Sequence, residues 1–99
     1  MKQVKIIYFY ANWSGPALRL KALFSQLKPV KEYPIEIHYL NADKRASMKK
    51  KYRVKLIPTT IFLQKGRETS RIEGAWHLNK YQETLLQSSS RGPQAKNEI

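Results

Sequence analysis

The chain of 99 residues is long enough for one compact domain with a modest core, and it contains no visible repeat or second domain. It has no cysteine, which excludes disulfide bonds, a thiol nucleophile and thiolate metal sites. Its 19 basic and 7 acidic residues give a net charge of +12, which favours an acidic protein, a nucleic acid or an anionic membrane surface as partner.

The first predicted elements are a strand and a helix. Residues 4–11 (VKIIYFYA) are almost continuously apolar, which predicts a central strand buried on both faces. Ser14 is a natural helix N-cap, and Pro16 suits the first turn, where its missing N–H is not needed. Pro29 is expected to end this helix. Four apolar residues at helical spacing predict its core-facing stripe: Leu20, Leu23, Phe24 and Leu27.

A second strand and a short helix follow. Residues 35–40 (IEIHYL) alternate at first between apolar and polar side chains, as a strand does. Asn41 and Asp43 are then expected to cap a short, basic helix that runs to about Tyr52.

The sequence of the last part of the domain predicts a hairpin and a helix. Residues 60–64 and 68–72 are expected to pair around a tight turn at Lys65-Gly66. Leu78, Tyr81 and Leu85 space a final helix that ends at about Gln87. Residues 88–99 are polar and aperiodic, so we expect a domain over residues 1–87 and a flexible C-terminal tail over residues 88–99.

The order strand, helix, strand, helix, strand, strand, helix predicts an α/β fold with a four-stranded mixed sheet. The apolar run after residues 1–3 is too short for a signal sequence or a membrane span. We therefore expect a cytoplasmic protein without a membrane span.

The segment Trp13-Ser14-Gly15-Pro16-Ala17 is similar to the active-site motif of the thioredoxin family, Trp-Cys-Gly-Pro-Cys. The order of elements also resembles the thioredoxin core, over roughly residues 4–87. The resemblance starts at the family's central strand, so the expected fold is thioredoxin-like and truncated at its N-terminus.

The resemblance implies a peptide-binding groove and a supporting carboxylate. Asp43 corresponds to the aspartate that hydrogen-bonds the ring N–H of the motif tryptophan. Residues 57–59 correspond to the cis-proline loop that pairs with substrate backbones, and residues 74–75 to the wall of the groove. The implied groove residues are Trp13, Gly15, Pro16, Ile57, Pro58, Thr59, Gly74 and Ala75.

The chain departs from the family at the residues that carry redox chemistry. Ser14 and Ala17 stand at the two cysteine positions, and Tyr8 and Tyr39 stand where active members often have an aspartate and a lysine. Thiol–disulfide exchange needs a thiolate, so the chain as written is no disulfide reductase, although the family activity is thiol–disulfide oxidoreduction. The loss is either natural or a deliberate replacement in an active parent.

Three further features each have a functional and a purely structural interpretation. Ser14 is either a nucleophile, for which His38 or His77 would have to act as base, or only a helix cap. The basic run at residues 44–55 is either a solvated helix face or a patch for an acidic ligand beside the groove. Trp76 either enlarges the groove surface or folds back onto the last helix.

The leading hypothesis is a redox-inactive thioredoxin-like protein that binds a polypeptide, an acidic one among the candidates, in the cis-proline groove. The first alternative is a thioredoxin-type oxidoreductase with its active-site cysteines replaced. The second is a basic nucleic-acid-binding accessory protein. No cofactor and no metal site are expected, and the oligomeric state is left open.

Overall fold

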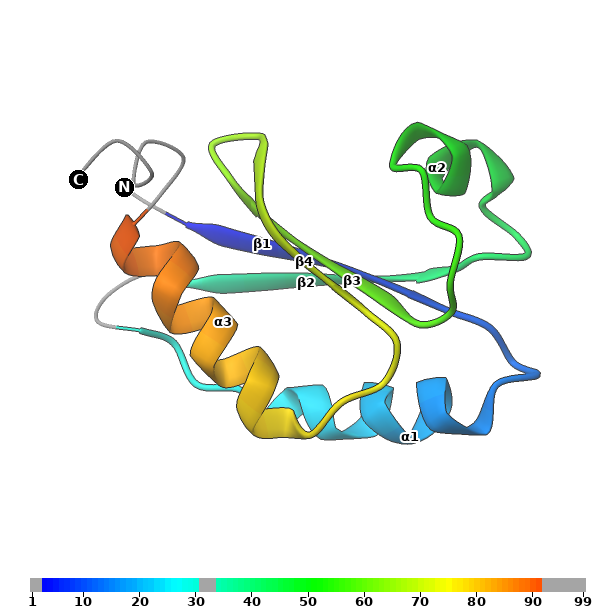
Figure 1. The fold of residues 1–99 in the computed structure, drawn as a ribbon, viewed down its shortest axis with the longest axis horizontal. Coiled ribbons are helices and arrows are strands. Elements are labelled where there is room, and N and C mark those ends of the chain that lie inside the picture. The colour runs from blue at the N-terminus through cyan, green and yellow to red at the C-terminus, as the bar shows by residue number, and fades with distance from the viewer. Residues whose placement is uncertain (1–2, 31–33, 92–99) are drawn as a thin grey trace.

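The fold is given by a computed structural model, which describes residues 3–30 and 34–91, the last four by their backbone alone (Figure 1). The predicted α/β fold with a four-stranded mixed sheet is confirmed. Its elements in chain order are β1 (Val4–Tyr10), α1 (Gly15–Leu23), the 3₁₀ turn η1 (Phe24–Gln26), β2 (Ile35–Asn41), α2 (Ala46–Lys51), β3 (Thr59–Gln64), β4 (Arg67–Glu73) and α3 (Leu78–Arg91).

The sheet has the strand order β2-β1-β3-β4, so β1 lies inside it and β2 is an edge strand. β1 runs parallel to β2 and antiparallel to β3, and β3 pairs with β4 in a hairpin. Phe9, near the end of β1, is paired with Leu40 of β2 and with Thr59 of β3. The carboxyl ends of β1 and β2 and the start of β3 therefore meet at one end of the sheet.

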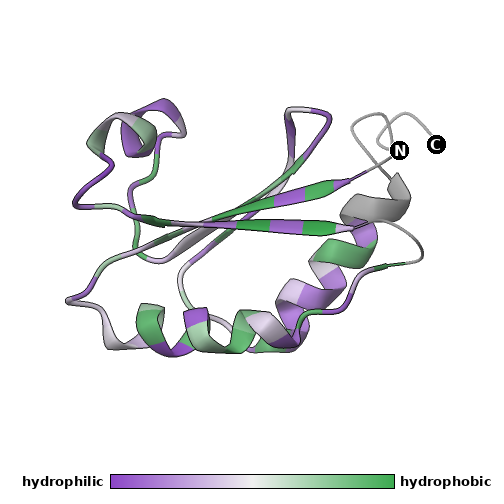
Figure 2. Cartoon of the chain, turned by 180° about the vertical axis from the view of Figure 1, so that it is seen from behind, coloured by the Kyte–Doolittle hydropathy of each residue, from purple (hydrophilic) through white to green (hydrophobic). Residues whose placement is uncertain are grey.

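The alternation of side chains along β1 divides the core into two layers. Val4, Ile6 and Tyr8 face α1 and α3, whereas Ile7 and Phe9 face the side on which α2 lies. Figure 1 shows α1 and α3 on one face of the sheet and α2 on the opposite face, and Figure 2 shows the alternating hydropathy of the strands. The central strand is thus buried on both faces, as predicted from its apolar run.

The sheet face that carries α2 is covered by this helix at one end only, and long polar side chains extend over part of the rest. Arg71 of β4 donates from Nε to Glu68 Oε2 at 2.8 Å and from Nη2 to the Tyr52 carbonyl at 2.7 Å, which ties β4 to the end of α2. At the other edge, His38 contacts Glu36 on β2. Ion pairs and hydrogen bonds here border the apolar layer where no helix covers it.

The predicted stripe of the first helix is wrong at one position. Leu20, Phe24 and Leu27 are buried, but Leu23 is 39% exposed. Leu23, the last residue of α1, lies at the edge of the stripe formed by Leu20 and Phe24, because residues three and four positions further along a helix do not project in the same direction. Pro29 is not what ends the helix, because the 3₁₀ turn already stops at Gln26.

The predicted capping of the second helix is also wrong. α2 begins after Arg45, which makes no side-chain capping bond. The Asn41 side chain instead accepts a hydrogen bond from the Asp43 backbone at 3.0 Å, and the Asp43 carboxylate accepts one from Trp13. Both potential caps are therefore engaged before the helix starts.

The last helix is longer than predicted, because α3 continues to Arg91 rather than ending at about Gln87. Of the predicted tail, residues 92–99 lie outside the described residues. No helix within the described part of the chain is both long enough and apolar enough to cross a bilayer.

Neighbouring substitutions in the first helix test the observed boundary. Phe24→Ala should lower the free energy of unfolding by about 3–5 kcal/mol, because Phe24 is 1% exposed and its loss opens a cavity. Leu23→Ala is the matched control and should lower it by only about 1 kcal/mol, because Leu23 is 39% exposed. Urea denaturation followed by far-UV circular dichroism measures both, and equal losses would contradict the observed burial.

Candidate functional site

Three segments that are far apart in the sequence meet where β1 and β2 end. The Ala42 backbone donates to the Tyr10 carbonyl at 2.7 Å and joins the strand ends. The Gly74 backbone donates to the Pro58 carbonyl at 2.8 Å, and the Ile57–Pro58 peptide bond is cis. The start of α1, the cis-proline loop and the end of β4 thus lie at the same end of the molecule (Figure 1).

Ser14 serves as the cap of α1. Its hydroxyl accepts a hydrogen bond from the Ala17 backbone at 3.2 Å, and the residue is buried. In the described part of the chain, His38 has Glu36 as its hydrogen-bond partner, and neither histidine bonds Ser14. The N-cap interpretation accounts for Ser14, and the site supplies no base that would make it a nucleophile.

Trp13 is held at the rim of the site. Its ring nitrogen donates to Asp43 Oδ2 at 3.0 Å, while 68% of the residue remains exposed. The bond fixes the loop before α1 to the end of β2, 30 residues further along the chain. The indole therefore presents apolar surface to solvent while its polar group is already satisfied.

Tyr8 lies directly beneath the start of α1. The residue is fully buried, and its hydroxyl donates to the Ala17 carbonyl at 2.6 Å. Burial, with the nearby Tyr81 and Tyr39 as weaker causes, raises the pKa of Tyr8 far above its usual range. Tyr8 thus places a neutral hydrogen-bond donor beneath the first turn of α1.

Ile57 lies in the cis-proline loop, directly before Pro58. Within residues 3–30 and 34–91, no hydrogen bond involves its N–H or C=O, and the side chain packs onto the α2-side core. The neighbouring Thr59 hydroxyl caps the Leu56 carbonyl, so the loop beside Ile57 is internally fixed. An unpaired N–H and C=O on a fixed loop is the arrangement that an extended peptide completes by strand addition.

A small apolar patch extends the site on the side of β4. Gly74 has φ +90°, a conformation that favours glycine, and a Cβ there would lie 3.6 Å from Trp76 Nε1 and 3.7 Å from Leu56 Cδ2. Leu56 and Trp76 are 49% and 50% exposed. We call Leu56, Gly74 and Trp76 the apolar patch; Leu56 was not predicted as a site residue, because only tertiary structure brings it to Gly74.

Trp76 contacts the last helix through Lys80 and also stays half exposed. Its ring nitrogen donates to the Glu73 carbonyl at 2.9 Å, and the ammonium of Lys80 in α3 lies 4.4 Å from the ring centroid. The Tyr81 hydroxyl donates to the Gly74 carbonyl at 3.1 Å and anchors the loop to α3. The half-exposed ring is therefore held in place beside the site.

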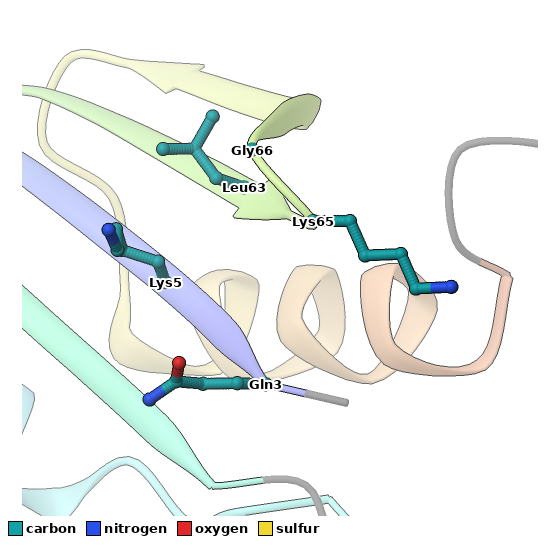
Figure 3. A pocket seen from close by; sticks show the side chains of 5 residues that line it. All are labelled: Gln3, Lys5, Leu63, Lys65 and Gly66. Atoms are coloured by element: carbon teal, nitrogen blue, oxygen red, sulfur yellow. The ribbon is translucent and has the colours of Figure 1, made fainter. Parts of the chain in front are cut away.

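The remaining predicted residues surround the start of α1 and the cis-proline loop. Pro16 and Ala75 are exposed, Gly15 is partly exposed, and Thr59 is buried. No three His, Asp or Glu side chains gather as metal ligands among the described residues. A pocket of about 230 Å³ lies at the far end of the sheet, beside the hairpin turn, and is lined by Gln3, Lys5, Leu63, Lys65 and Gly66 (Figure 3).

Comparison with known proteins gives the following matches. A family model described as Thioredoxin matches residues 1–87. The mitochondrial thioredoxin-2 of Schizosaccharomyces pombe is 36% identical over 73 residues, which cover 74% of this chain and 54% of the relative. The thioredoxin of Borreliella burgdorferi is 34% identical over 58 residues, covering 59% of this chain and 50% of the relative. The chain spans about half the length of these curated relatives.

Solved structures share the fold. Thioredoxin-2, described as a component of malaria parasite protein secretion machinery, matches with a TM-score of 0.76 at 23% identity, covering 85% of this chain and 82% of that one. Fasciola hepatica thioredoxin matches with a TM-score of 0.67 at 29% identity, covering 84% and 78%. The first of these similarities, at its low identity, is one of fold alone.

The hydrogen bond beneath α1 predicts how Tyr8 affects stability. Tyr8→Phe should lower the free energy of unfolding at pH 7 by about 0.5–1.5 kcal/mol, since the buried bond to the Ala17 carbonyl is lost. Tyr39→Phe is the control, because Tyr39 is 36% exposed and its hydroxyl makes no hydrogen bond with a described residue.

The same variant gives a pH signature. A tyrosine whose pKa is raised by folding stabilises the protein fully below the pKa of the unfolded chain, about 10, and this contribution is lost as pH rises above it. Urea midpoints of the native protein should therefore fall between pH 9 and 11 (about one unit either side of that value) more steeply than those of Tyr8→Phe. Parallel curves would show that Tyr8 does not remain neutral in the folded state.

Proposed function

Because this chain belongs to the thioredoxin family, we propose that it is a redox-inactive member that binds an extended polypeptide segment along the Ile57–Pro58 loop. The observation that carries the proposal is the unpaired backbone of Ile57 within a fixed frame of site residues. The segment would pair with the Ile57 N–H and C=O as an added strand, with Trp13 and Gly74-Ala75 beside it.

Redox inactivity is supported by the chemistry at the start of α1. Ser14 and Ala17 supply no thiol to attack a disulfide or to resolve a mixed disulfide. The Ser14 hydroxyl is used as a cap, and Tyr8 presents a bound neutral hydroxyl below Ala17. We therefore propose capture of a polypeptide without turnover, unaffected by the redox state of the solution.

Other expectations stay predictions. The net charge of +12 favours an acidic polypeptide among possible ligands. A cytoplasmic location remains a prediction from the sequence. An oxidoreductase with replaced cysteines is the enzymatic alternative, and a double reversion distinguishes it from the binding module.

Peptide binding is tested by titrating the ¹⁵N-labelled protein with a library of extended decapeptides. Binding along the loop should shift the Trp13 indole signal and the amide signals of Ile57, Thr59 and Ala75. Signals of Lys65 and Gly66, at the other end of the hairpin, serve as the internal control and should stay in place. If no peptide moves the Ile57 and Ala75 signals at millimolar concentration, the proposed binding mode is wrong.

The enzymatic alternative is tested by the double variant Ser14→Cys with Ala17→Cys. We expect no disulfide reduction above that of the single variant Ser14→Cys, because Tyr8 leaves the second thiol without a proton acceptor. Reduction of a protein disulfide with a dithiol donor measures this, after circular dichroism has established that both variants are folded. Robust turnover by the double variant alone would instead identify the chain as a silenced oxidoreductase.

A further inference from the structure

We infer that the ligand segment is bipartite, with carboxylates that meet the basic segment of residues 44–55 and an apolar side chain that covers the apolar patch. The inference rests on the proposed function and adds the chemistry of the ligand. It assigns the choice of ligand to residues outside the family motif, in the basic segment and in the apolar patch.

The basic segment carries charge without compensation. Its basic residues are Lys44, Arg45, Lys49, Lys50, Lys51, Arg53 and Lys55. All are exposed except Lys49, which is half-buried, and none forms an ion pair with a described residue. No acidic residue occurs between Asp43 and Glu68. The segment is therefore a concentrated field of one sign, which attracts carboxylates.

Helix stability explains only part of this charge. Lys49, Lys50 and Lys51 lie in the last turn of α2, where cations interact favourably with the helix dipole. Lys44 and Arg45 precede the helix, where positive charge is unfavourable, and Arg53 and Lys55 lie beyond its end. The four charges that do not stabilise the helix, those of Lys44, Arg45, Arg53 and Lys55, are also the ones nearest to the site residues along the chain.

Each end of the basic segment adjoins a residue of the site in the chain. Lys44 directly follows Asp43, whose carboxylate holds the Trp13 indole at 3.0 Å. Lys55 directly precedes Leu56 and the unpaired Ile57. A strand paired with Ile57 and extended past Lys55 therefore has these ammonium and guanidinium groups close to its side chains.

The other half of the ligand meets the apolar patch. Leu56 and Trp76 flank Gly74, and both are about half exposed. The Trp76 ring nitrogen is already bonded to the Glu73 carbonyl, so a ligand that covers the ring displaces water without breaking a hydrogen bond. An apolar side chain therefore gains the most binding free energy at this position, because it buries apolar surface.

A polypeptide suits these groups better than a nucleic acid does. The Ile57 backbone offers one donor and one acceptor, which matches the main chain of a strand. One face of the Trp76 ring is occupied by the Lys80 ammonium, which leaves less of the ring for the stacking of a base. Single-stranded nucleic acid is therefore the competitor in the test and not the proposed ligand.

The test compares fluorescent decapeptides in 0.15 M salt by anisotropy. One peptide has an acidic half and a leucine-rich half; the others replace the acidic half with lysines, replace the leucines with serines, or reverse the order of the halves. We expect the better of the two acidic–apolar orders to bind at least about tenfold more tightly than the lysine peptide, as two or three charge pairs would give.

Charge-matched variants locate the acidic half. Arg53→Glu with Lys55→Glu should weaken the acidic–apolar peptide by about tenfold. Lys65→Glu with Arg67→Glu is the control at the far end of the sheet and should weaken it by less than about threefold. Each pair lowers the net charge from +12 to +8, and each contains one residue with positive φ, Arg53 at 55° and Lys65 at 54°.

A third variant locates the apolar half. Trp76→Ala should weaken the acidic–leucine peptide by about tenfold and leave the acidic–serine peptide within about twofold. Leu23→Ala, on the exposed side of α1, is the control and should change neither affinity.

The outcomes separate the inference from the proposed function. Equal affinity for acidic and basic peptides, with the Ile57 signal still shifted, overturns the inference alone. An equal effect of the two charge-matched pairs also overturns it, since net charge would then suffice. If no peptide shifts the amide signal of Ile57, the proposed function itself is overturned. An oligothymidine is the remaining competitor. If it binds more tightly than any peptide, and if Arg53→Glu with Lys55→Glu abolishes that binding, the basic segment binds nucleic acid instead.

Discussion

The structure depends on the burial of β1 on both of its faces. Alternate side chains of β1 belong to the two apolar layers on either face of the sheet, and its backbone is paired with β2 and β3. This double burial fixes the register, because a shift of one residue would exchange the two layers and place Lys5 in the core. The loop after β1 is thereby delivered to the ends of β2 and β3, where the site forms.

The site is held by fixed contacts, and its residues Ser14 and Ala17 carry no thiol. The start of α1 is capped by Ser14, the Trp13 ring nitrogen is bonded to Asp43, and among the described residues the Ile57 N–H and C=O are unpaired. Below the start of α1, the Tyr8 hydroxyl donates to the Ala17 carbonyl from within the core. This hydrogen bond ties the first turn of α1 to the central strand.

The elements could be predicted where local rules decide the structure. Ser14 and Pro16 mark the start of α1, and the apolar run marks β1, because capping and periodicity depend on neighbouring residues. Leu23 was misplaced because it lies at the edge of the helix stripe, where spacing alone does not decide burial. The cap of α2 failed for a different reason: Trp13, 30 residues earlier, takes the Asp43 carboxylate. Leu56 became a site residue only through its tertiary contact with Gly74.

The uncompensated charge of residues 44–55 also affects the free-energy balance of the whole domain. Mutual repulsion raises the free energy of the unliganded fold, and salt relieves it over a distance of about 8 Å at physiological ionic strength. Any anion that neutralises the segment in the native state shifts the folding equilibrium toward that state by mass action. Without a bound anion, the domain is therefore least stable at low ionic strength, where its electrostatic field also extends furthest. Binding of an anion to this segment and the free energy of unfolding are thermodynamically linked.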